Sequence, residues 1–184
     1  MTPPLTGVVL GSDSDWPVVE PGYRVLEEFG VGVEVVVASA HRTPDDVRDF
    51  ARGAAARGIE VIIAAAGGAA HLPGVVAAHT TLPVIGLPVG DSRPQGGGTL
   101  GGLDAALSML QMPAGVPVGV MAINGGKNAA LYAVSILALK DAELAKKLRL
   151  YREAQADAVR SKSKALVSKI NGGHETPGDE HRNV

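Results

Sequence analysis

The sequence predicts a three-layer α/β/α fold of the flavodoxin or Rossmann type, with a central parallel sheet and a long C-terminal helix. Short runs rich in Val and Ile recur along the chain, and their almost continuous apolarity is typical of parallel strands buried on both faces. Helical segments separate these runs, so five β–α units follow one another and favour right-handed crossovers onto one sheet. The 24 glycines and 12 prolines predict many tight turns between these elements.

The expected strands are the apolar runs at 7–10, 33–38, 61–65, 84–89 and 118–123. The first expected helix covers 17–29 and ends at Gly30, which suits a C-cap, while Pro21 and Gly22 predict a kink or a separate first turn. Thr43 can cap the second helix, in which Pro44 suits the first helical position. That helix ends near residue 58, and further helices are expected after Pro73 and at 103–110, 128–139 and 141–169.

The domain prediction is one catalytic domain over 1–170, which includes the last helix, and a disordered tail at 171–184. Leu144, Leu148 and Tyr151 form one stripe on that long helix, and no strand follows it. A partner subunit can cover the stripe, or the helix can be a solvated amphipathic one.

Composition excludes several classes of function. The 184 residues carry a formal net charge of -2 and only 3% aromatic residues, which argues against nucleic-acid binding. The absence of cysteine excludes disulfides, thiolate metal sites and cysteine nucleophiles. The N-terminus does not have the pattern of a signal peptide, and no apolar run is long enough to span a membrane. We therefore expect a cytoplasmic protein with no membrane partner.

Polar loops should meet at one edge of this sheet, because open parallel sheets bind ligands beyond the carboxyl ends of their strands. The loop at 11–16 holds two hydroxyls and two carboxylates ahead of a helix. Its backbone amides suit a phosphate, Ser12 or Ser14 can add hydrogen bonds, and Asp15 can accept from ribose hydroxyls. The alternative is that Asp13, Ser14 or Asp15 only caps the helix.

Two further loops contribute histidines. At 39–44, Arg42 can hold a phosphate with its planar guanidinium, and His41 has the side chain best suited to move protons near neutral pH. At 66–74, small residues surround His71 and can form a carboxylate-binding nest of backbone amides. The alternative there is a tight turn whose backbone satisfies His71. A last small-residue turn at 124–129 can close over a ligand or cap the next helix.

Other motifs fail. Residues 96–101 match G-x-G-x-x-G, but no strand directly precedes them and no acidic residue lies about 20 positions further on. His41, His71 and His79 lack the spacing of helical zinc ligands, so the sequence predicts no metal site. The residues alone indicate an enzyme for a small phosphorylated, nucleotide-like substrate with a histidine proton carrier.

The three polar loops carry a resemblance to a known family. Their sequences GSDSDW, SAHRTP and AGGAAHLPG are similar to those of the class I N5-carboxyaminoimidazole ribonucleotide mutases, the PurE family. Further segments extend this resemblance in the same order, at 82–89, 103–119 and 122–131. The resemblance implies an isomerase of de novo purine biosynthesis that uses no cofactor and no metal. It also implies a homo-octamer with sites at subunit boundaries, in which a partner subunit covers the last helix.

The resemblance also implies residue roles. His41 and His71 would be catalytic, with His41 as the proton carrier and His71 beside the migrating carboxyl group. Ser12 and Asp15 would bind the aminoimidazole ribonucleotide substrate, and Arg42 its phosphate. The pocket would be completed by Ser14, Ser39, Gly67, Gly68, Ala69 and Ala70.

Class II relatives instead carboxylate aminoimidazole ribonucleotide directly with CO2. They typically carry Lys after the second-loop His and lack the segment HLPG, so Arg42 and residues 71–74 favour class I. Two features depart from the family pattern, namely a longer loop at 90–102 and Pro21-Gly22 inside the first helix. A non-catalytic nucleotide-binding module, and an isomerase or lyase for another phosphorylated compound, stay open as alternatives.

Overall fold

The computed structural model describes residues 4–90 and 100–172. Its sheet has five parallel strands in the order β2-β1-β3-β4-β5. The strands are β1 (Thr6–Leu10), β2 (Val33–Val37), β3 (Val61–Gly67), β4 (Val84–Val89) and β5 (Gly119–Val120). This is the flavodoxin strand order. The predicted fold class is therefore confirmed.

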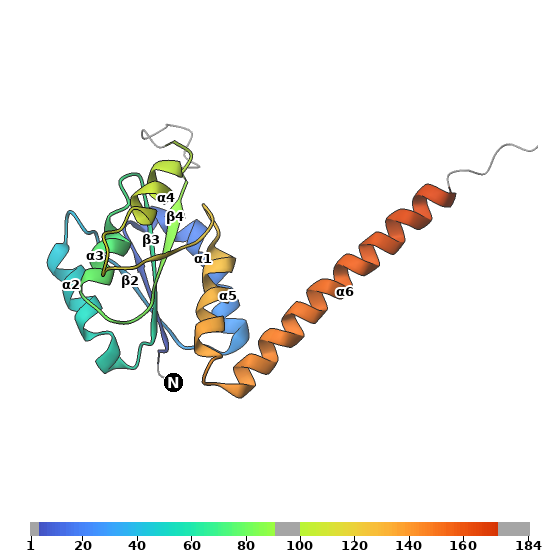
Figure 1. Cartoon of the computed structure of the whole chain (residues 1–184), viewed down its shortest axis with the longest axis horizontal. Coiled ribbons are helices and arrows are strands. Elements are labelled where there is room, and N and C mark those ends of the chain that lie inside the picture. Colours follow the sequence, from blue (N-terminus) through green and yellow to red (C-terminus); the bar gives the residue numbers. More distant parts are fainter. Residues whose placement is uncertain (1–3, 91–99, 173–184) are drawn as a thin grey trace, which may run out of the picture. The chain divides into compact units, whose positions relative to one another are not determined.

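Helices cover both faces of the sheet (Figure 1). One face carries α1 (Trp16–Phe29) and α5 (Gly126–Leu137), and the other carries α2 (Pro44–Gly53), α3 (Leu72–Ala78) and α4 (Leu103–Leu110). Two short 3-10 turns, η1 (Asp13–Asp15) and η2 (Ala55–Arg57), lie in the connections. The last helix, α6, spans Ala142–Gly172. None of the helices in the described ranges is both long enough and apolar enough to cross a membrane.

The chain divides into a first unit that ends at Ala145 and a second unit that begins at Lys146. The first holds the sheet and its covering helices, and the second consists, where it is described, of the greater part of α6. The start of α6 is capped by Asp141, whose Oδ1 accepts from the Leu144 amide at 2.9 Å. The prediction of one domain over 1–170 stays a prediction, and the predicted tail lies outside the described residues from position 173 onward.

The two edge strands are less buried than the sequence predicts. Val35 and Val37 of β2 are 39% and 57% exposed, although their apolar run indicated burial on both faces. A run of valines cannot distinguish a central strand from an edge strand, because the side-chain pattern is the same in both. The central strands β1 and β4, by contrast, are buried along their whole length.

The fifth strand is shorter than predicted. The expectation of a strand over 118–123 is wrong, because only Gly119–Val120 pairs regularly with β4. Met121 and Asn124 still donate their amides to the carbonyls of Gly86 and Pro88, both at 2.9 Å. Pro88 has no N–H of its own to return toward this segment, so a regular ladder stops there.

Helix α1 is continuous from Trp16, so the alternative of a separate first turn is wrong. It ends as predicted at Gly30, which has a φ of 76° and donates to the carbonyls of Leu26 and Glu27. Gly22 has a packing role: a Cβ there would collide with the backbone of Gly126 in α5. The same holds in reverse for Gly126 and the carbonyl of Val18. At this crossing, the backbones of the two helices are therefore in direct contact, with no side chain between them.

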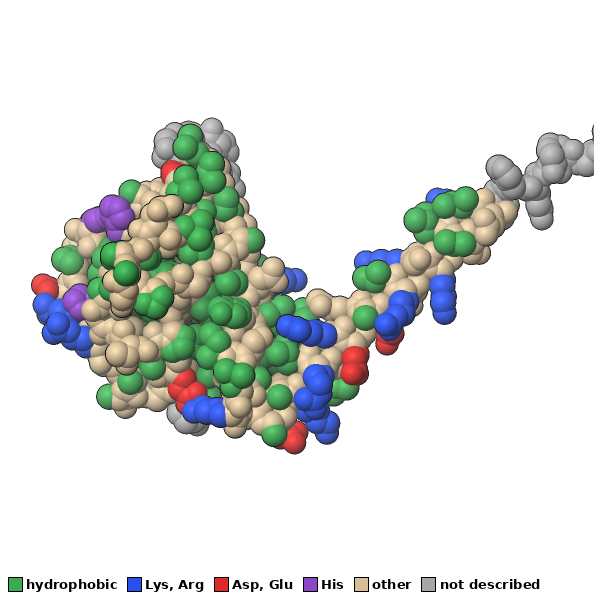
Figure 2. All heavy atoms as spheres, viewed as in Figure 1, with side chains coloured by type: hydrophobic (Ala, Val, Ile, Leu, Met, Phe, Trp, Pro, Cys, Tyr) green, Lys and Arg blue, Asp and Glu red, His purple; other side chains and the backbone are tan. Residues whose placement is uncertain are grey.

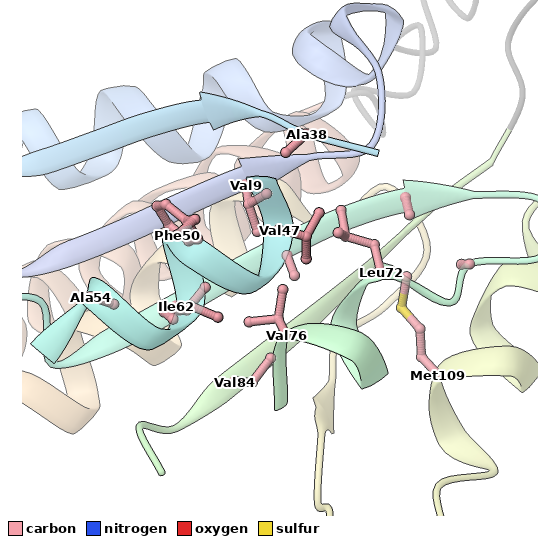
Figure 3. Packing of buried hydrophobic residues seen from close by; sticks show 14 of the residues in the cluster. Val9, Ala38, Val47, Phe50, Ala54, Ile62, Leu72, Val76, Val84 and Met109 are labelled. Atoms are coloured by element: carbon pink, nitrogen blue, oxygen red, sulfur yellow. The ribbon is translucent and has the colours of Figure 1, made fainter. Parts of the chain in front are cut away.

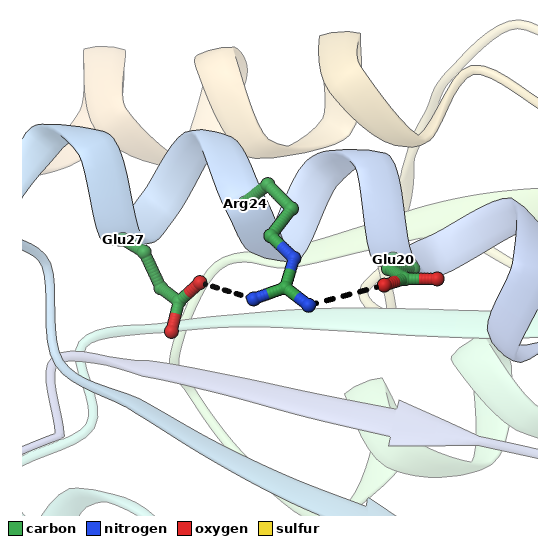
Figure 4. Close-up of polar contacts among 3 residues, drawn as sticks. All are labelled: Glu20, Arg24 and Glu27. Atoms are coloured by element: carbon green, nitrogen blue, oxygen red, sulfur yellow. Dashed lines mark hydrogen bonds and ion pairs between the residues drawn. The ribbon is translucent and has the colours of Figure 1, made fainter.

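The exposed side of α1 carries a small charge network (Figure 4). Arg24 bridges Glu20 at 3.2 Å and Glu27 at 3.0 Å. The hydrogen bonds that Arg24 donates to Glu27 and, to a smaller extent, to Glu20 raise the pKa of Arg24. All three side chains are largely solvent-exposed, so this network adds little to the stability of the fold.

A hydrophobic core fills the space between the sheet and helices α2, α3 and α4 (Figure 3). Val9 and Ile62 from the strands are fully buried against Val47 of α2 and Val76 of α3. Burying a side chain of this size contributes about 1.5–3 kcal/mol. This packing holds α2 and α3 against the sheet, and so fixes the loops that lead into their N-termini.

Candidate active site

A cavity of about 530 Å³ lies at the carboxyl edge of the sheet. It is lined by ten of the eleven residues predicted from the sequence, namely Ser12, Ser14, Asp15, Ser39, His41, Arg42, Gly67, Gly68, Ala69 and His71. Ala70 does not line it, because its side chain is 2% exposed and borders a neighbouring cavity of about 440 Å³. The predicted convergence of three loops is therefore confirmed, with Ala70 as the exception.

The loop after β1 is held by a reciprocal cap. The Ser12 amide donates to Oδ2 of Asp15 at 3.1 Å, and the Ser14 amide donates to Oγ of Ser12 at 3.3 Å. The Ser14 hydroxyl also donates to Ser12 Oγ at 2.9 Å. Asp15, which is only 7% exposed, closes the cap of the η1 turn, whereas at the N-cap of α1 its side chain makes no capping hydrogen bond. The cap presents the hydroxyls of Ser12 and Ser14 to the cavity.

The loop after β2 folds back on itself before α2. The Ser39 amide donates to Oγ1 of Thr43 at 2.9 Å, and the Thr43 amide donates to the Ser39 carbonyl at 2.9 Å. Thr43 does occupy the N-cap position of α2, but its side chain does not cap the helix amides. The predicted side-chain cap is therefore wrong, because the hydroxyl is used to close the loop that carries His41 and Arg42.

Arg42 spans the first two loops. Its Nη2 donates to the Gly11 carbonyl at 3.4 Å, and its Nε donates to Ser39 Oγ at 3.4 Å. Both contacts are long, so they hold the guanidinium loosely while leaving most of its five N–H donors for another acceptor. An anion between the first loop and Arg42 would meet the guanidinium on one side and the hydroxyls of Ser12 and Ser14 on the other, because most amides of this loop already donate within the protein.

The two histidines come from positions 30 residues apart and meet in the cavity. Nε2 of His41 lies 2.8 Å from Nδ1 of His71, which is hydrogen-bonding distance. The ring centroids are 4.9 Å apart and the ring planes are nearly perpendicular, at 84°. Both side chains are exposed. The two ring nitrogens are therefore placed to form one hydrogen bond at the wall of the cavity.

The loop after β3 depends on two glycines. Gly68 has a φ of 62°, and a Cβ at Gly67 would lie 3.0 Å from the carbonyl of Val89. Tight turns follow, with the His71 amide donating to the Ala69 carbonyl at 2.7 Å. His71 therefore sits at the N-cap of α3, and His79 at the C-cap of the same helix.

Sequence reasoning gave no role to the end of β4. Val89 and Gly90 line the cavity, and the Gly90 amide donates to Oδ1 of Asn124 at 2.8 Å. Asn124 has a φ of 58°, which is uncommon outside glycine, and so marks a specialised turn. In the sequence, only the small-residue turn at 124–129 pointed to a role for Asn124.

The longer loop predicted at 90–102 lies mostly outside the described residues. Its two ends meet, since Gly102 packs against Gly90.

Across residues 4–90 and 100–172, no three potential metal ligands among His, Asp and Glu come together. The prediction that the site uses no metal stays a prediction.

Comparison with known proteins identifies the family. The family described as AIR carboxylase matches residues 5–158. The chain belongs to the AIR carboxylase family. Within this family it is 52% identical over 163 residues to a Thermotoga maritima protein named N5-carboxyaminoimidazole ribonucleotide mutase, covering 89% of this chain and 92% of that one. A Mycobacterium tuberculosis protein of the same name is 51% identical over 170 residues, with 90% and 94% covered.

Solved structures agree with the family and with the fold. The crystal structure of Treponema denticola PurE superposes with a TM-score of 0.78 at 28% identity, and covers 89% of this chain and 98% of that one. The resemblance to the PurE family that rested on three polar loops is confirmed. As a member of the AIR carboxylase family, the chain is an enzyme.

Proposed function

We propose that this AIR carboxylase family member is an N5-carboxyaminoimidazole ribonucleotide mutase, an isomerase of de novo purine biosynthesis. Relatives of that name share about half of its residues over most of both chains. The observation that carries the proposal is that one cavity holds His41, His71 and Arg42 together. Its volume of about 530 Å³ falls in the range of small-molecule sites.

The substrate phosphate binds between Arg42 and the first loop. The guanidinium supplies charge-assisted hydrogen bonds, which are about twice as strong as neutral ones. The Ser12 and Ser14 hydroxyls add donors, and the buried Asp15 accepts from the ribose. The aminoimidazole ring then extends toward the histidine pair, which lines the same cavity.

The reaction consists of two proton steps around a bound CO2. The N–C bond to the carboxyl group breaks, CO2 leaves, and the exocyclic nitrogen takes a proton from the His41 imidazolium. C4 of the ring then attacks CO2, and the C4 proton passes to the neutral His41, which restores the imidazolium. The small residues Gly67, Gly68 and Ala69 leave room for CO2 beside the ring, and positioning keeps it there.

The competing activity is direct carboxylation of aminoimidazole ribonucleotide by CO2. The two are separated by incubating the protein with N5-carboxyaminoimidazole ribonucleotide, and separately with aminoimidazole ribonucleotide plus bicarbonate, while following the product by absorbance. A mutase converts the first substrate at low bicarbonate. Conversion of the second substrate only would overturn the proposal in favour of the carboxylase, and binding without turnover of either would favour a non-catalytic module.

We also propose that the chain assembles as a homo-octamer. The stripe on α6 continues at three- and four-residue spacings through Leu144, Leu148, Tyr151, Gln155, Val159, Lys162, Leu166 and Ile170. Val159, Leu166 and Ile170 are 66%, 59% and 63% exposed in the single chain. Figure 2 shows hydrophobic side chains alternating with Lys and Arg along the last helix. A narrow seam of this spacing, apolar except at Gln155 and Lys162, packs against another helix.

Light scattering tests this assembly. An octamer has about eight times the subunit mass of 18.8 kDa. A monomer at micromolar concentration would contradict it.

A further inference from the structure

The hydrogen bond between the two histidines assigns a role to each ring nitrogen. We infer that His71 is a positioning residue: its Nδ1 accepts the Nε2–H of His41 throughout the reaction, so that His41 always gives and takes the substrate proton at Nδ1. This inference rests on the proposed function, because it concerns the same site and the same proton. It starts from the contact of 2.8 Å between His41 Nε2 and His71 Nδ1.

The direction of this hydrogen bond follows from what a proton carrier must do. To accept the C4 proton, a neutral His41 needs one unprotonated nitrogen that faces the substrate, and only Nδ1 is not engaged with His71. Its own hydrogen must then reside on Nε2 and point to His71. In the imidazolium form Nε2 still carries its hydrogen, so the same donor and acceptor pair persists in both protonation states.

The opposite direction does not support the reaction. If His71 donated from Nδ1 to Nε2 of His41, the hydrogen of a neutral His41 would lie on Nδ1. Its free nitrogen would then be a donor only, and could not take the proton from C4. His71 therefore acts on His41 as the oriented acceptor acts on the histidine of a catalytic triad, fixing its tautomer and its ring orientation.

The surroundings of His71 fit such a role. Its backbone is held at the N-cap of α3, where the Val75 amide donates to its carbonyl at 3.0 Å. The next residue, Leu72, is 2% exposed and packs in the core. The loop that carries the acceptor is thus anchored, while the His41 loop is closed on itself through Ser39 and Thr43. With Nδ1 accepting, the neutral His71 carries its hydrogen on Nε2, where it can donate to a carboxyl group in the cavity.

Nitrogen-15 NMR of the intact protein labelled at histidine tests the assignment directly, without relying on activity. At alkaline pH, where both rings are neutral, we expect the shared hydrogen on His41 Nε2 and none on His71 Nδ1. Coupling across the hydrogen bond between these two nitrogens would assign the pair. A hydrogen found on His71 Nδ1 would overturn the inference, whatever the enzyme turns out to catalyse.

Kinetics supply the second readout. His71→Leu removes the acceptor at similar side-chain volume, and we expect kcat to fall at least about tenfold, less than the roughly 10²–10⁴-fold loss of a general acid–base group itself. The dissociation constant of aminoimidazole ribonucleotide, which has no carboxyl group for His71 to bind, should change little, and circular dichroism should report an intact fold. The matched control is His79→Leu at the other end of α3, which should leave kcat unchanged.

The outcomes separate the two proposals. An unchanged kcat in His71→Leu would overturn the positioning role while leaving the mutase activity standing. A wild-type protein that converts neither ribonucleotide would overturn the proposed function, and the NMR assignment would still decide the direction of the hydrogen bond. If His71→Leu fails to fold, His71→Phe repeats the measurement with a ring that cannot accept.

Discussion

Glycine serves opposite purposes in two regions of this molecule. At the cavity, a Cβ on Gly68 would meet no atom within 4 Å, but the backbone there has a φ of 62°. At the α1–α5 crossing, Gly22 and Gly126 have no unusual φ, but a Cβ on either would collide with the backbone of the other helix. In the first region glycine allows a loop conformation that lines the ligand cavity, and in the second it allows helices α1 and α5 to approach each other closely. Changes at the cavity should therefore alter activity, and changes at the crossing should alter stability.

The largest effect is expected for His41→Asn at the cavity. Asn keeps a polar side chain but cannot carry a proton, so kcat should fall at least about a hundredfold. The thermal unfolding midpoint should stay at the wild-type value, because the His41 side chain is exposed. Steady-state kinetics give kcat, and a thermal melting curve on the same preparation gives the unfolding midpoint. An active His41→Asn beside an inactive His71→Asn would reverse the assignment of the proton carrier.

A smaller loss of activity is expected for Arg42→Ala. Removing a charge-assisted contact costs roughly 1.5–3 kcal/mol of binding, which corresponds to a rise in KM of about ten- to a hundredfold. Arg42→Lys should recover only part of this, because an ammonium lacks the bidentate fork. If KM is the same in Arg42→Ala and in the wild type, the phosphate does not bind at Arg42.

At the crossing, Gly22→Ala should lower stability and spare the chemistry. Alanine is favoured over glycine in a helix by about 1 kcal/mol, but overpacking against a backbone costs about 1–3 kcal/mol or more. We expect a net loss in the free energy of unfolding, measured by denaturant titration, with kcat per folded molecule unchanged.

The matched control is Gly74→Ala in α3, where a Cβ would meet only the flexible end of Met112 at 2.9 Å. That side chain can move, so Gly74→Ala should keep wild-type stability. Equal losses in Gly22→Ala and Gly74→Ala would show that backbone contact at the crossing is not the cause.

The smallest effect is expected for Arg24→Ala on the exposed side of α1. Its bridges to Glu20 and Glu27 are solvent-screened, so neither the unfolding midpoint nor kcat should differ measurably from the wild type. A clear drop in the midpoint would mean that the surface of α1 contributes more to the fold than its exposure suggests.

The fold and most of the cavity could be predicted because they depend on local patterns. Apolar runs separated by helical segments require a parallel sheet, and loops after its strands must meet at one edge. This rule alone predicts that Ser12, His41 and His71 lie close together.

The rest depends on contacts between distant segments. The pattern of valines does not show that β2 is an edge strand. The sequence around Pro88 does not show that the hydrogen-bonded pairing of β4 with β5 ends there. The packing role of Gly22 requires knowing that Gly126 lies across from it. Asn124 acts through a hydrogen bond to Gly90, and Thr43 turns back to Ser39 rather than capping α2, so both roles appear only when the partner is in place.

The central claim is that the cavity performs proton chemistry at C4 through His41. Exchange of the C4 hydrogen of aminoimidazole ribonucleotide with solvent deuterium, followed by proton NMR with no CO2 present, tests this step alone. The wild-type protein should accelerate the exchange, and His41→Asn should return it to the uncatalysed rate while still binding the ribonucleotide. Exchange that proceeds equally fast in His41→Asn would contradict the account.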